Sequence, residues 1–139
     1  MSFATEIDFV ERYLSIERLR LGERLQIDWQ LETLPASARL PLLSLQPIVE
    51  NAIYHGIEPS RGGGTIVIAA RSLANRLEVT VSNPFEADSA THHHDGNRIA
   101  LNNVRQRLRA HFGDDAELHS EQRDGRYVVC LRVPLAGAA

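Results

Sequence analysis

The chain has 139 residues, enough for a single domain with its own hydrophobic core. Hydrophobic residues make up 43% and charged residues 24%, and the formal net charge of -3 gives no case for direct nucleic-acid binding. The single cysteine, Cys130, excludes a disulfide framework, and the longest uncharged apolar stretch, Leu40 to Val49, is too short to span a bilayer.

The first half of the chain predicts a helix, a strand and a second helix. Apolar residues recur at helical spacing from Thr5 to Leu21, with Thr5 as the expected N-cap. Apolar and polar side chains alternate from Leu25 to Leu31, which predicts a strand with one buried face. The next helix is expected from about Leu42 to Ile57, with Pro47 in or near its first turn, where a missing N–H does little harm.

The middle of the chain predicts a hairpin followed by a long loop. Two apolar runs, Thr65 to Ala70 and Leu77 to Val81, flank a turn within residues 71–76 and read as paired strands. The segment from Pro84 to Asn97 has no periodicity and few apolar residues. A loop of this length in a compact domain is often functional.

The last part predicts one helix and two strands. The helix is expected from Ile99 to Phe112, and the strands around Ala116 to Glu121 and Tyr127 to Val133, joined by a turn at Asp124-Gly125. The helix should turn four apolar residues inward: Ile99, Leu101, Val104 and Leu108. The element order predicts an α+β fold, a two-layer α/β sandwich with one mixed five-stranded sheet and three main helices on one face.

The second predicted helix carries the most informative polar residues. Asn51 and His55 are four residues apart and share a helix face, and Glu50 lies beside them at the edge of the apolar stripe. An amide oxygen suits a hard cation such as Mg²⁺. On periodicity alone, three solvated polar residues on an amphipathic helix explain the pattern more simply.

The amino-acid sequence of these segments resembles that of a known family. The stretch LQPIVENAIYHGI resembles the N box of the histidine-kinase, gyrase, Hsp90 and MutL ATPase superfamily, and the nearer match is to sensor kinases of the LytS and AlgZ type. Three further stretches resemble, in the family's order, the linker helix, the second glycine box and the closing strand: FVERYLSIERLRLGERL, GNRIALNNVRQRL and GRYVVCLRVP.

The resemblance implies a Bergerat-type ATPase fold that uses ATP and Mg²⁺. It implies that Asn51 coordinates Mg²⁺ and that Glu50 helps to orient or deprotonate the attacking group. His55 would lie near the phosphates, although Tyr54 replaces the lysine that many relatives place before it.

The resemblance also assigns nucleotide contacts to the second half of the chain. The segment of about 84–97 would be the ATP lid, and Gly96 and Arg98 would open a helix whose N–H groups and dipole favour phosphate. Leu101 and Asn103 in the same box are expected to contact the nucleotide as well. Arg98 stands where relatives have glycine.

The first glycine box departs from the family pattern. Relatives carry an aspartate that accepts a hydrogen bond from the adenine amino group, and here the stretch reads Val81-Ser82-Asn83-Pro84. The carbonyl oxygen of Asn83 can accept the same bond, and Ser82 can act through water. We therefore expect Ser82 and Asn83 at the adenine, with altered contacts.

The domain and partner expectations follow from the resemblance. Residues 1–22 would be a linker helix after a missing phosphoacceptor and dimerisation region, and residues 23–139 the ATP-binding kinase domain. The domain would transfer the γ-phosphate to a histidine outside this chain, so the fragment should not label itself. The intact protein would be a membrane-anchored bacterial homodimer that signals to a response regulator, with this domain in the cytoplasm.

Two other interpretations stay open. The altered glycine boxes allow a degenerate nucleotide-binding or regulatory interaction module without kinase activity. A serine kinase of the anti-sigma-factor type shares the fold, but the linker-like N-terminal helix and the Gln-Pro-Ile-Val-Glu-Asn wording argue against it.

Overall fold

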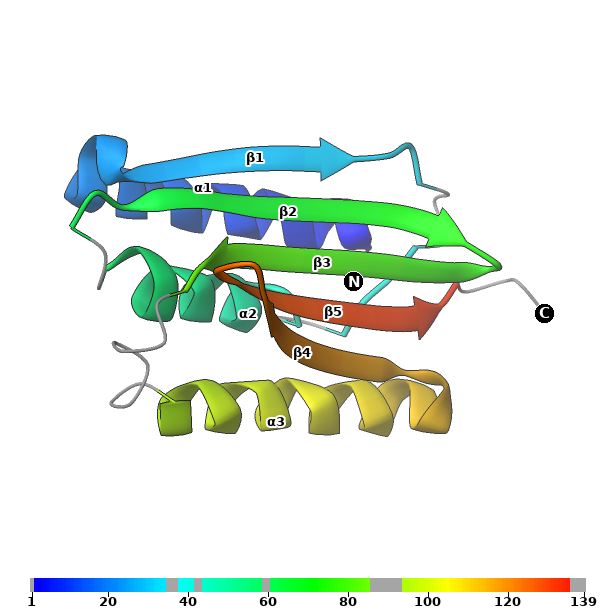
Figure 1. Ribbon diagram of the computed structural model, residues 1–139. Coiled ribbons are helices and arrows are strands. Elements are labelled where there is room, and N and C mark those ends of the chain that lie inside the picture. Colours follow the sequence, from blue (N-terminus) through cyan, green and yellow to red (C-terminus); the bar gives the residue numbers. More distant parts are fainter. Residues whose placement is uncertain (1, 35–37, 42–43, 59–60, 86–93, 136–139) are drawn as a thin grey trace.

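The computed structural model describes residues 2–34, 38–41, 44–58, 61–85 and 94–135, and only the backbone of residues 94–98 (Figure 1). The described residues form three α-helices: α1 (Phe3–Leu21), α2 (Gln46–Ala52) and α3 (His94–Phe112). They also form five strands: β1 (Leu25–Leu31), β2 (Gly64–Leu73), β3 (Arg76–Pro84), β4 (Glu117–Arg123) and β5 (Arg126–Pro134). Short helical turns follow each helix: η1 (Gly22–Arg24), η2 (Ile53–Ile57) and η4 (Gly113–Asp115).

The five strands form one mixed sheet in the order β1-β2-β3-β5-β4. Strand β1 runs parallel to β2, and the other three neighbouring pairs are antiparallel. Figure 1 shows α1, α2 and α3 on the same side of the sheet. The predicted fold class, a two-layer sandwich of a mixed five-stranded sheet and three helices, is confirmed.

The hydrophobic core fills the space between the helices and the sheet. Alternate residues of each strand point towards the helices, which is the period-two pattern of a half-buried sheet. The strands contribute apolar side chains that are at most 5% exposed: Ile66, Ile68, Ala70, Leu77, Val79, Val81, Leu118, Val129, Leu131 and Val133. The helix α1 contributes Phe3, Ile7, Val10, Leu14 and Leu21 to the same core.

The start of α1 differs from the prediction. Its N-cap is Ser2, whose hydroxyl accepts a hydrogen bond from the amide of Thr5, so the expectation that Thr5 itself is the cap is wrong. The Ser2 side chain lies three residues before Thr5, at the spacing that a cap requires. Both residues are helix-capping types, and the sequence does not say which one is used.

The second helix consists of two joined parts. Helix α2 begins at Gln46, later than the predicted start near Leu42, which lies outside the described residues. Pro47 occupies the first turn as predicted. The chain then continues without a break into η2, a π-helical turn that ends at Ile57. We call α2 and η2 together the N-box helix.

Helix α3 begins earlier than predicted. It starts at His94, so residues 94–97 are helical and not part of an irregular loop; residues 86–93 of the predicted loop lie outside the described residues. Leu101, Val104 and Leu108 are buried as expected. Ile99 is 62% exposed, and its predicted inward position is wrong because two residues turn a helix by about 200° away from Leu101.

The two hairpin turns match their sequences. Ala74 and Asn75 both adopt positive φ angles between β2 and β3, and Asp124 and Gly125 do so between β4 and β5. Two consecutive residues with positive φ form the turn that suits the right-handed twist of paired strands.

Candidate functional site

The predicted nucleotide-binding segments converge at one edge of the molecule. Figure 1 shows the C-terminal ends of β3 and of the N-box helix, together with the first turn of α3, at the same edge. One tight contact there joins Gly56 to Asn83. A Cβ atom added to Gly56 would lie 2.4 Å from the Asn83 Nδ2 atom, so only glycine fits against this side chain.

Asn83 lies on the covered face of the sheet. Its side chain is only 3% exposed, and its Nδ2 donates a 2.8 Å hydrogen bond to the carbonyl of Pro84. The predicted adenine-binding position is thus a buried amide held against the N-box helix.

Ser82 points to the opposite face. Alternation along β3 turns its hydroxyl away from the helices, where it receives hydrogen bonds of 3.2 and 3.1 Å from Nε and Nη2 of Arg126. Arg126 also donates to the backbone carbonyl of Thr65 at 2.8 Å. The structure therefore does not bring the Ser82 side chain together with Asn83 and the N-box helix.

The three polar residues of the N-box helix have different surroundings. Glu50 is exposed and accepts a 3.2 Å hydrogen bond from Gln46 Nε2. The Asn51 Nδ2 atom is buried and has no hydrogen-bond partner among the described residues. The half-buried ring of His55 lies edge-on to Tyr54, with 4.9 Å between ring centroids. A buried amide without a protein partner is a group that a ligand can satisfy.

The start of α3 supplies backbone N–H groups at the same edge. Gly96 and Arg98 lie within its first two turns, so Gly96 does not precede the helix N-terminus as expected but is part of it. Leu101 is 5% exposed and packs in the core, while Asn103 is exposed on the surface of the helix. The early α3 N–H groups point along the helix axis and have no partners within the helix.

A magnesium ion would need the nucleotide to complete its coordination. No group of three His, Cys, Asp or Glu side chains in the described part of the chain could hold a metal ion. Mg²⁺ keeps several waters and binds through few protein ligands together with substrate phosphates. Such an ion would need phosphate oxygens besides the Asn51 amide oxygen that the family resemblance assigns to it.

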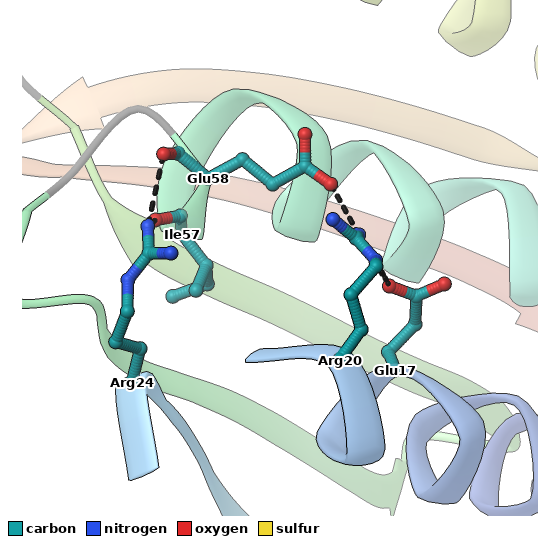
Figure 2. Close-up of polar contacts among 5 residues, drawn as sticks. All are labelled: Glu17, Arg20, Arg24, Ile57 and Glu58. Atoms are coloured by element: carbon teal, nitrogen blue, oxygen red, sulfur yellow. Dashed lines mark hydrogen bonds and ion pairs between the residues drawn. The ribbon is translucent and has the colours of Figure 1, made fainter. Parts of the chain in front are cut away.

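Several residues that contact the N-box helix were not predicted as functional. The Glu6 carboxylate in α1 accepts a 2.8 Å hydrogen bond from the Leu45 amide, and Arg20 and Arg24 bind the other end of the helix, at Ile57 and Glu58 (Figure 2). One signal was available in the sequence, because Glu6 falls among the inward-facing positions of its helix.

Comparison with known proteins identifies the family, although no family model matches the chain. The sensor histidine kinase BtsS of Escherichia coli K12 is 33% identical over 135 residues, which cover 96% of this chain. The sensor protein LytS of Staphylococcus saprophyticus is 30% identical over 142 residues, which cover 94% of it. The chain belongs to the family of sensor histidine kinases that includes LytS. It spans about a quarter of the length of these relatives, 24% in both cases.

Solved histidine-kinase structures share the fold of this catalytic domain. The nucleotide-free catalytic domain of the histidine kinase ThkA matches with a TM-score of 0.69, covering 97% of this chain and 93% of that chain at 14% identity. ThkA in complex with the response regulator TrrA matches with a TM-score of 0.66, covering 98% and 41% at 13% identity. Within the described residues, no helix is long and apolar enough to cross a membrane.

Proposed function

We propose that this kinase domain binds ATP with Mg²⁺ at the edge formed by the N-box helix, the end of β3 and the start of α3. The observation that carries the proposal is the contact between Gly56 and Asn83. It joins the two segments that the family resemblance assigns to nucleotide binding, and the buried Nδ2 atom of Asn51, on the same N-box helix as Gly56, has no hydrogen-bond partner among the described residues. Membership of the sensor histidine kinases supports the same conclusion.

Each side chain at this edge has a distinct task in the proposal. The Asn51 carboxamide oxygen would hold Mg²⁺, and the ion when bound would supply positive charge to stabilise the phosphates. Glu50, exposed at the surface of the helix, faces the incoming histidine and orients it. His55 would lie near the phosphates. Phosphoryl transfer depends on positioning and charge stabilisation more than on covalent chemistry by the protein.

The phosphoacceptor belongs to another part of the protein in this proposal. Since the chain spans about a quarter of its curated relatives, their remaining length has room for acceptor, dimerisation and sensing regions. A membrane-anchored homodimer with this domain in the cytoplasm fits such an arrangement. The ThkA complex with TrrA supports a response regulator as the next partner of the phosphoryl group.

Titration calorimetry with a nonhydrolysable ATP analogue tests the proposal. We expect Mg²⁺-dependent binding that weakens about tenfold or more in Asn51→Ala and in Asn83→Ala, since each loses a polar contact in a buried site. Ser82→Ala is the matched control, because its side chain lies on the other face of the sheet, and it should bind as the wild type does. Equal binding by all three variants would contradict the proposed site.

A regulatory module without nucleotide chemistry is the second candidate. The observation that favours it is the hydrogen bond from Asn83 to Pro84, which gives this residue a structural task in place of the family's aspartate. In that case the wild-type domain should show no heat of binding with the analogue at millimolar concentration. The same titration therefore separates the two functions.

A further inference from the structure

The N-box helix is held at its N-terminal end by a buried carboxylate of α1. Glu6 is 0% exposed, and its Oε1 accepts a 2.8 Å hydrogen bond from the backbone amide of Leu45, one residue before α2 begins. The first amides of a helix have no partner within the helix. A negative charge at this end also interacts favourably with the helix dipole.

The C-terminal end of the same helix is held by two arginines. The Arg24 Nη2 atom donates to the backbone carbonyls of Ile57 and Glu58, at 3.2 and 3.0 Å. Arg20 pairs with the carboxylate of Glu58 and with Glu17 on its own helix. Figure 2 shows both arginines reaching from the end of α1 and η1 to the last turn of the N-box helix. Positive charge at this end matches the helix dipole, as the carboxylate does at the other.

The backbone around Arg24 leaves little room for movement. Gly63, at the start of β2, adopts a φ of +69°, and a Cβ atom there would lie 2.0 Å from the Arg24 carbonyl oxygen. The guanidinium group therefore projects from a backbone position that is packed against the edge of the sheet. Its contacts with Ile57 and Glu58 place the end of the N-box helix relative to that sheet.

A small axial shift of the N-box helix would disturb the candidate site. Gly56 precedes the two carbonyls that Arg24 binds and packs so closely on Asn83 that a methyl group does not fit. A helix rises about 1.5 Å per residue, so a shift of one residue would bring a different side chain over Asn83. The contacts at the two ends fix the axial position that this packing requires.

We propose that Glu6 and Arg24 are positioning residues, and that α1 together with the η1 turn that follows it sets the position of the N-box helix at the nucleotide site by holding both of its ends. The inference rests on the proposed function, because the Asn51 and His55 side chains that are positioned belong to that site. Neither residue touches the nucleotide. Displacing α1 would change nucleotide affinity through the N-box helix.

Arg24 variants test the proposal with two independent measurements. Arg24→Ala removes both carbonyl contacts, and Arg24→Lys keeps the charge and can restore one of them. Arg12→Ala, at an exposed arginine of α1, is the matched control. We measure the affinity for the magnesium complex of a nonhydrolysable ATP analogue and the hydrogen exchange of amides 53–58 without nucleotide, beside the midpoint of whole-protein unfolding.

We expect Arg24→Ala to weaken binding by about tenfold, with Arg24→Lys in between and Arg12→Ala unchanged. Exchange at amides 53–58 should rise in Arg24→Ala by more than the change in global stability explains. At the other end, Glu6→Ala should weaken binding in the same way, whereas Glu6→Gln keeps an acceptor oxygen and should bind more tightly than Glu6→Ala.

The outcomes separate this inference from the proposed function. A folded Arg24→Ala variant with wild-type affinity and wild-type exchange overturns the positioning role while the nucleotide site stands. A wild-type chain that does not bind the analogue contradicts both the function and the positioning of that site. If Arg24→Ala does not fold, Arg24→Lys and Arg20→Gln replace it, and unchanged affinity and exchange in both overturns the inference.

Discussion

The two faces of the sheet treat polar side chains in different ways. On the open face, Glu78 lies between two arginines: its Oε1 accepts from Arg71 Nε at 3.0 Å and its Oε2 from Arg132 Nε at 2.7 Å. On the covered face, Asn83 is buried against Gly56, and the buried Asn51 Nδ2 atom has no hydrogen-bond partner among the described residues. The charged side chains Glu78, Arg71 and Arg132 of the open face pair with one another, whereas Asn83 on the covered face packs against the N-box helix.

This difference separates residues with a structural task from residues with a functional one. A charged side chain that pairs with partners on neighbouring strands has a structural role, because the pair stabilises the sheet. A polar group in an apolar layer costs free energy unless something satisfies it, so it needs another explanation. Asn83 is such a group, and it lies where the end of β3 meets the N-box helix, which is where we place the nucleotide.

The largest expected effect comes from filling the contact on the covered face. Gly56→Val would force a branched side chain against Asn83, and we expect a loss of about 1–3 kcal/mol in the free energy of unfolding, the usual effect of overpacking. Chemical denaturation measures it. The control is Gly62→Ala, where an added Cβ meets no atom within 4 Å and stability should change little. Equal losses in both variants would show that the Gly56 contact is not tight.

A smaller effect is expected on the open face. The guanidinium of Arg132, helped by that of Arg71, holds the pKa of the Glu78 carboxyl below its ordinary value of 4.5. A carboxyl with a lowered pKa stabilises the fold above its ordinary value, and this contribution is lost as the pH falls through the folded-state pKa.

Glu78→Gln should therefore lower stability by about 1 kcal/mol at pH 7 and flatten its pH dependence below pH 4.5. Denaturation at several pH values measures both changes. Because the arginine partners are half-exposed, added salt should reduce the difference. If Glu78→Gln keeps the wild-type dependence of stability on pH below pH 4.5, another carboxyl group is responsible for that dependence.

The smallest effect concerns the contact between α1 and the N-box helix. Burial raises the pKa of Tyr13 to about 12, and the carboxylates of Glu17 and Glu50 add to the shift. Ultraviolet titration of wild type against Tyr13→Phe should show one phenol that ionises later than free tyrosine. Glu50→Gln should lower that pKa slightly, because one nearby negative charge is removed. An unchanged value would place Glu50 farther from α1 than the structure has it.

The fold could be predicted from the sequence where local patterns decide it. Turn residues such as Asn75 and Gly125, and the alternation around Val79, are local signals that predicted the hairpins. The parallel pairing of β1 with β2 could not be predicted, since it joins segments far apart in the chain. The start of α3 at His94 could not be predicted either, because no apolar periodicity marks its first turn.

The candidate site could be predicted in part. The four-residue spacing of Asn51 and His55 predicted that they share one face of a helix. The family resemblance predicted that Asn83 lies at the adenine. Successive side chains of a strand point to opposite faces, so Asn83 shares the face of the buried Val81 and Ser82 points to the other face. The alternation in the sequence already indicates this difference. The contacts of Glu6 and Arg24 depend on tertiary packing, which no local pattern reveals.

The parallel pairing of β1 also has a consequence for the order of folding. The antiparallel strands can pair through short turns, which cost little chain entropy, whereas β1 joins β2 only after a long connection that contains the N-box helix has closed. We therefore expect the hairpins to form first and the N-terminal helix and strand to dock last. A domain that folds in this order fixes the proposed nucleotide edge in the final step, so an intermediate with only β2 to β5 paired should not yet bind ATP.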